Sequence, residues 1–101
     1  MSKHTVNLEW KAGGEDFSSA NYTRNHRLSF DNGLVLSASA APGYLGDAGA
    51  VDPEEMLVAS LSSCHMLTFL AIASKRTYVV VSYQDNAIGY LEKNTAGKMA
   101  I

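Results

Sequence analysis

The sequence has little of what marks several common classes of protein. It holds one cysteine, Cys64, among 101 residues, so the chain cannot form an intrachain disulfide. Charged residues make up 18% of it and the formal net charge is -2, so it has neither a basic field for nucleic acid nor an acidic tail. We therefore expect no nucleic-acid partner.

Targeting and metal-binding signals are also missing from the sequence. The N-terminus, MSKHT, lacks the apolar region of a secretory signal, so we expect a reducing, cytoplasmic setting. His4 and His26 have no second ligand at metal spacing, so we predict no metal site, and no cofactor is expected. About 100 residues without an internal repeat suit a single domain.

The longest apolar segment spans residues 52–74, and both of its ends carry helix signals. Asp52 suits the N-cap, Pro53 the first helical position, and Glu55 the capping-box position three residues after the cap. After Pro53 no glycine or proline interrupts the segment, and Lys75 follows where the helix dipole is negative. The sequence therefore predicts a helix over residues 53–75.

This helix is apolar on nearly every face, so a single-sided amphipathic helix is excluded. About 20 apolar residues could instead span a membrane. The small or polar side chains around the middle of the segment argue against that, and we expect no membrane partner. A water-soluble chain of this length can hardly cover a central helix from two sides, so we expect a homodimer.

The segments before the helix have the patterns of strands and turns. Residues 4–10 and 22–30 alternate with the period of a half-buried strand, which places Arg24 on the same face as the apolar Leu28. An Asn-Gly turn signal after residue 30 predicts an antiparallel hairpin with a strand at 34–39.

Residues after the helix are rich in β-branched and aromatic types, which favour strands over 77–83 and 87–91. Residues 93–97 read as a hairpin turn into a last strand that ends with the sequence at Ile101. The prediction is a single α+β domain over 1–101, with a hairpin sheet (4–39), a loop (40–52), a central helix (53–75) and C-terminal strands (77–101).

Three stretches resemble the OsmC/Ohr family, the osmotically inducible protein C and organic hydroperoxide resistance proteins. They are YTRNHRLSFDNG at 22–33, DPEEMLVASLSSCHM at 52–66 and the Ser82-Tyr83 pair. The resemblance implies an OsmC-like α+β fold, in which two chains intertwine and their antiparallel sheets enclose two long central helices. It also implies active sites at the interface between the chains.

The same resemblance implies a cysteine-based peroxidase that reduces organic hydroperoxides. Cys64 matches the position of the peroxidatic cysteine, Arg24 that of the activating arginine, and Glu54 that of the glutamate which orients the arginine. Family members carry a resolving cysteine in a further C-terminal part, which this sequence lacks. We therefore expect either a truncated chain or one that relies on an external thiol or dithiol reductant.

The spacing of these residues leaves two arrangements open. Glu54 precedes Cys64 by ten residues, or about 15 Å along a straight helix, so the two side chains cannot meet within one such helix. Either the helix breaks near Ser60, or Glu54 serves the cysteine of the other subunit. Glu54 also has a simpler interpretation as a carboxylate that stabilises the helix start, and both roles can hold together.

An apolar pocket for the alkyl part of a peroxide is predicted from Tyr44, Leu45, Met56 and Phe69, although core packing is the commoner use of such side chains. Without the family motif, a lone cysteine would be interpreted as a small buried hydrophobe. The alternative function, because the resolving cysteine is absent, is a non-catalytic dimer of the same fold, structural or binding a small apolar molecule. The natural peroxide and the physiological reductant are not determined by the sequence.

Overall fold

The computed structural model describes residues 1–93 and 99–100. These form two compact units, an N-terminal unit (Met1–Pro53) and a C-terminal unit (Glu54–Ile101), and each is described by itself. The single-domain organisation and the wrapping of the sheet around the helix stay predictions.

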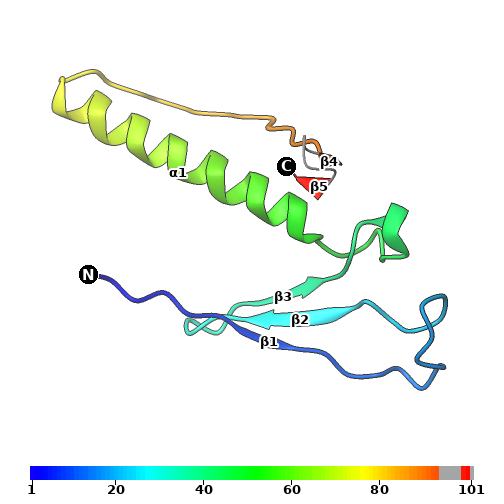
Figure 1. Cartoon of the computed structure of the whole chain (residues 1–101). Helices are drawn as coiled ribbons and strands as arrows, with labels where there is room; N and C mark the ends of the chain where they lie inside the picture. Colours follow the sequence, from blue (N-terminus) through cyan, green and yellow to red (C-terminus); the bar gives the residue numbers. More distant parts are fainter. Residues whose placement is uncertain (94–98, 101) are drawn as a thin grey trace. The chain divides into compact units, whose positions relative to one another are not determined.

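The N-terminal unit is built on a three-stranded antiparallel sheet (Figure 1). Its strands are β1 (Asn7–Glu9), β2 (His26–Ser29) and β3 (Val35–Ala38), in that order across the sheet. Leu28 stands between Leu8 and Leu36 in the register, and it is buried with 8% of its surface exposed. This row of leucines is the apolar centre of the sheet.

The predicted hairpin between β2 and β3 is confirmed. The Phe30 amide donates to the Leu34 carbonyl oxygen and the Gly33 amide to the Phe30 carbonyl oxygen, both at 2.9 Å. Gly33 has φ 91°, which glycine adopts without a steric penalty. The Asn32 side-chain oxygen accepts from the Leu34 amide at 3.0 Å, which completes the turn.

The first two strands are shorter than the predicted spans of 4–10 and 22–30. Ahead of β2, loop side chains take up the backbone groups that a longer strand would pair. The Thr23 amide donates to Glu15 Oε1 at 2.9 Å, and Trp10 Nε1 donates to the Thr23 carbonyl oxygen at 2.9 Å. These bonds replace ladder hydrogen bonds, so the sheet begins only at His26.

The loop between β3 and the helix folds tightly on itself through the short 3₁₀ helix η1 (Pro42–Tyr44). The Gly46 amide donates to the Ala41 carbonyl oxygen at 3.1 Å. A Cβ atom built on Gly46 would lie only 1.6 Å from the Ala40 carbonyl oxygen, so no side chain fits there.

Gly46→Ala is expected to destabilise the chain by about 3 kcal/mol, because backbone atoms of residue 40 must move to admit the methyl group. Gly43→Ala is the matched control, since a Cβ there meets nothing within 4 Å. Urea unfolding followed by circular dichroism measures both changes. Equal stability of the two variants would contradict the close approach of Gly46 to the Ala40 carbonyl group.

The C-terminal unit contains α1 (Pro53–Lys75), and these bounds confirm the predicted helix. Its end is fixed by a Schellman motif, in which the Tyr78 amide donates to the Ala73 carbonyl oxygen and Thr77 adopts φ 61°. Within α1 only Ala73 is buried in the single chain. The cover expected for an all-round apolar helix, including a second copy of the chain, stays a prediction.

The strands predicted over 77–83 and 87–91 are wrong, because residues 78–91 form no strand. This segment instead runs back along α1 (Figure 1), held by a 2.6 Å bond from the Ser62 hydroxyl to Asp85 and by the rings of Phe69 and Tyr83, 5.7 Å apart. β-Branched and aromatic composition favours an extended backbone, but a strand also needs a partner to pair with.

A short antiparallel pair closes the chain, formed by β4 (Glu92–Lys93) and β5 (Met99–Ala100). This pairing agrees with the predicted final hairpin. Its predicted turn at 93–97 lies largely outside the described residues.

Candidate functional site

Arg24 is held rigidly at the end of the sheet. Its Nη1 donates to the Tyr22 carbonyl oxygen at 2.9 Å and its Nη2 to the Ser19 carbonyl oxygen at 2.7 Å. The guanidinium carbon lies 3.9 Å from the centroid of the Tyr22 ring, a cation–π distance. The side chain is half-buried, so the charge is oriented and remains within reach of a ligand.

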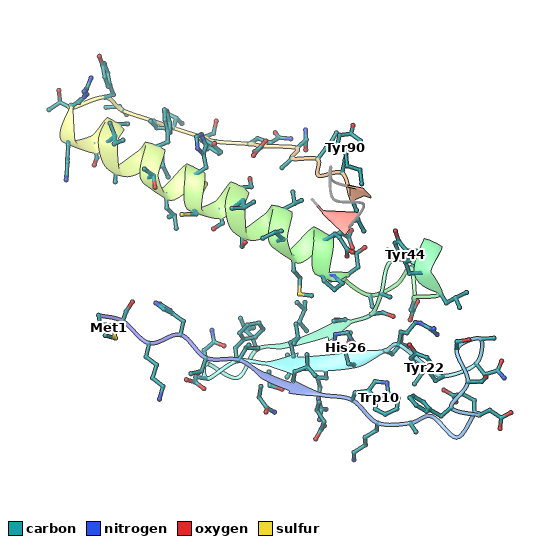
Figure 2. The ribbon with its side chains drawn as sticks, in the orientation of Figure 1. Met1, Trp10, Tyr22, His26, Tyr44 and Tyr90 are labelled. Carbon is teal, nitrogen blue, oxygen red and sulfur yellow. The ribbon has the colours of Figure 1, made fainter. Side chains whose placement is uncertain are left out.

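An aromatic cluster surrounds this arginine. Phe17 packs against Tyr22 with ring centroids 5.1 Å apart and against Trp10 at 6.2 Å. Figure 2 shows Trp10, Tyr22 and His26 at the same end of the sheet. An open pocket of about 450 Å³ is lined by these side chains, by Arg24 and by the buried Ser39.

The sequence prediction missed this pocket, although Phe17 is the one large apolar residue of the polar connection over residues 11–21. Trp10 and Tyr22 flank that loop on either side. The signal that could have indicated the pocket is a polar connection with aromatic residues at both ends and in its middle. A loop that closes on itself brings such rings together.

Cys64 lies in the middle of α1, where its side chain is exposed in the single chain and forms no disulfide. It is too far from either end of the helix for the terminal dipole to act on it, because that effect falls off within one turn. Activation of this thiol therefore depends on a charged group from another part of the structure.

Glu54 occupies the first turn of α1, and its Oε2 atom is buried without a hydrogen-bond partner among the described residues. A buried carboxylate oxygen with no donor is costly and calls for a structural reason. Because α1 is continuous from Pro53 to Lys75, the first of the two arrangements left open by the sequence, a break near Ser60, does not occur. Glu54 and Cys64 of one chain therefore stay about 15 Å apart along the helix.

The remaining site residues divide between the two units. Tyr44 belongs to η1 and Leu45 follows it, so both lie with Arg24 in the N-terminal unit. Met56 and Phe69 lie on α1 and are thirteen residues apart, or about 20 Å along the axis. One chain alone therefore cannot bring all four predicted pocket residues around a small alkyl group, and the approach of Arg24 to Cys64 stays a prediction.

Two further properties of the described residues bear on function. They contain no group of three His, Cys, Asp or Glu side chains able to hold a metal ion. Helix α1 is long and apolar enough to cross a membrane, with a hydropathy of 1.8, although the core helix of a soluble protein passes the same test.

An antiparallel three-stranded sheet, together with one long helix that carries a lone cysteine, makes this an α+β protein. The model of the family described as OsmC-like protein matches residues 46–98, more than half of the chain. A solved OsmC-like protein of unknown function from Vibrio cholerae O1 biovar eltor is 47% identical, with a TM-score of 0.93. The match covers 100% of this chain and 69% of that one.

The chain therefore belongs to the OsmC family and has its soluble α+β fold. No curated protein matches the sequence.

Proposed function

We propose that this chain is a cytoplasmic thiol peroxidase that reduces organic hydroperoxides to alcohols in defence against oxidative stress. The observation that carries the proposal is the place of Cys64, an exposed free thiol at the centre of α1 and inside the stretch matched by the OsmC family model. In this proposal Cys64 is the nucleophile, Arg24 the activating cation and Glu54 the residue that orients it.

The proposed step is a two-electron exchange at the sulfur. The Cys64 thiolate attacks the terminal oxygen of the hydroperoxide, the O–O bond breaks, and the alkoxide leaves and takes up a proton to become the alcohol. The sulfur is oxidised to a sulfenic acid. An external thiol then condenses with it and releases water, and a second thiol reduces the mixed disulfide and restores Cys64.

Arg24 suits the activating role because its guanidinium is permanently charged and held by two carbonyl oxygens. The Oε2 atom of Glu54 is buried with no hydrogen-bond partner in the part of the chain that the structure describes, which supports a charged partner for this carboxylate. The planar guanidinium of an arginine would supply the missing donor. Since α1 is unbroken, Glu54 would serve the cysteine of the partner chain. In this arrangement each active site is shared between two chains.

The catalytic cycle predicts a defined stoichiometry. Without added thiol, the chain should consume one equivalent of cumene hydroperoxide per Cys64, because it has no second cysteine. With dithiothreitol the consumption should continue over many turnovers. Continued consumption without any thiol would contradict a cycle that needs an external reductant.

The homodimer is proposed on the exposure of α1. Five large apolar side chains of this helix are between 42% and 61% exposed in the single chain, namely Leu57, Leu61, Leu67, Phe69 and Ile72. Burying what remains exposed is worth about 1 kcal/mol for each such side chain. A second copy of the helix is the cover that the family resemblance implies.

Leu61→Glu is expected to convert the dimer into monomers, because it places a charge in the middle of the proposed helix interface. Light scattering after size exclusion should give twice the chain mass of 10.8 kDa for the unmodified protein. The variant should have the mass of a single chain. Leu34→Glu, at a similarly exposed leucine in the hairpin turn, should remain dimeric. An unmodified protein that is monomeric at micromolar concentration would refute the shared site.

A further inference from the structure

The aromatic pocket of the N-terminal unit has the size and composition of a small-molecule site. Its volume of about 450 Å³ falls in the range of ligand pockets, and all of its lining residues belong to this one unit. Its walls are mostly rings, and Arg24 is the permanent cation among the lining residues. The pocket can therefore be considered apart from the thiol of Cys64.

The rings are positioned but not covered. Trp10 Nε1 donates to the Thr23 carbonyl oxygen at 2.9 Å, which fixes the indole, while 40% of Trp10 and 80% of Phe17 remain exposed. Aromatic side chains this exposed and this close together mark a surface that gains free energy when a flat apolar group stacks on it.

Arg24 adds a requirement for negative charge. Both of its hydrogen bonds go to neutral carbonyl oxygens, so they orient the guanidinium and use two of its five N–H donors. A planar fork with free donors matches a carboxylate, which accepts two parallel hydrogen bonds. One cation matches the single charge of a carboxylate better than the charge of about -1.5 to -2 on a phosphate monoester.

We propose that this pocket binds a small aromatic carboxylate, with its ring stacked on Trp10 and Phe17 and its carboxylate on the guanidinium of Arg24. The His26 Nδ1 atom donates to the Arg24 carbonyl oxygen at 2.9 Å and so fixes the backbone that carries the arginine. Such a ligand needs no reaction at Cys64, so the proposal goes beyond the peroxidase activity, although the two share Arg24.

Trp10 is the only tryptophan in the sequence, so its fluorescence reports directly on this pocket. The experiment titrates phenylacetate, and separately the neutral phenylacetamide, into the 101-residue protein carrying Cys64→Ser. This variant lacks the thiol, so the outcome is independent of peroxide chemistry. We expect a saturable change with phenylacetate and an affinity at least about 10-fold weaker for phenylacetamide, since a charged hydrogen bond is lost.

Two further variants in the same background separate charge from folding. Arg24→Met should reduce the affinity for phenylacetate to that for phenylacetamide, while Arg27→Met, on the exposed ion pair with Glu9, should leave it unchanged. If Arg24→Met does not fold, the comparison of carboxylate with amide in the Cys64→Ser protein decides the question.

The proposal is overturned by equal affinity for the two compounds, or by the absence of a saturable change. It is also overturned if the fluorescence of Trp10 changes with protein concentration alone and phenylacetate has no effect. In that case a second copy of the chain occupies the aromatic surface.

Discussion

Cys64→Ser is expected to reduce the consumption of cumene hydroperoxide to the uncatalysed background. A serine hydroxyl has nearly the shape of the thiol but does not ionise near neutral pH. Its oxygen also cannot be oxidised by the peroxide as the sulfur is when it becomes a sulfenic acid. A ferric–xylenol orange assay of the remaining peroxide, with and without dithiothreitol, measures the loss.

Ser63→Ala is the matched control for this loss. Ser63 neighbours Cys64 on α1 and is likewise exposed in the single chain, so its removal perturbs the same turn without touching the thiol. It should retain one equivalent of consumption per chain. If Cys64→Ser consumes as much peroxide as the unmodified protein, the proposed nucleophile is wrong.

Arg24→Met is expected to slow the oxidation of Cys64 by about 10²- to 10³-fold, the usual effect of removing one preorganised charged donor from an active site. Methionine retains much of the apolar length against the Tyr22 ring but removes the charge. The rate constant for sulfenic acid formation, from stopped-flow mixing with cumene hydroperoxide, measures the effect.

Two variants show whether that effect belongs to the charge at residue 24. Arg24→Lys should recover only part of the rate, because an ammonium keeps the charge but loses the planar fork. Arg27→Met removes the arginine of β2, three residues after Arg24, where its ion pair with Glu9 is exposed, and should change the rate by less than about twofold. Equal losses at both arginines would indicate a general electrostatic effect.

The features that the sequence predicted well depend on local signals. The bounds of α1 follow from Pro53 at its first position, acidic residues in its first turn and Lys75 in its last. The hairpin turn follows from Gly33, which occupies the position of that turn where φ is positive. Each signal acts within a few residues, so each can be identified without knowing the rest of the fold.

The failures all involve partners that are distant in the sequence. Residues 78–91 have strand composition, but composition does not specify whether a neighbouring strand exists to pair with them. The strand before His26 was predicted too long because a side chain of the preceding loop, Glu15, takes the Thr23 amide. The aromatic pocket depends on Trp10 and Tyr22 meeting around Phe17, which only the closure of that loop determines.

The catalytic roles of Cys64, Arg24 and Glu54 rest on the sequence motif and stay predictions. The structure adds that α1 is unbroken and that one oxygen of Glu54 is buried with no hydrogen-bond partner among the described residues. Because the helix is unbroken, the arrangement that remains of the two is the one in which Glu54 of one chain acts on Cys64 of the other. A shared site cannot be deduced from the pattern of a single chain, because its geometry depends on a second copy.

The most direct test of the central claim is the intact mass of the purified protein before and after one equivalent of cumene hydroperoxide, with dimedone as the trap. Dimedone reacts with sulfenic acids, so we predict one dimedone adduct per chain, located at Cys64 by peptide mapping. A folded dimer that gains no adduct under these conditions would contradict the assignment of Cys64 as a peroxidatic cysteine.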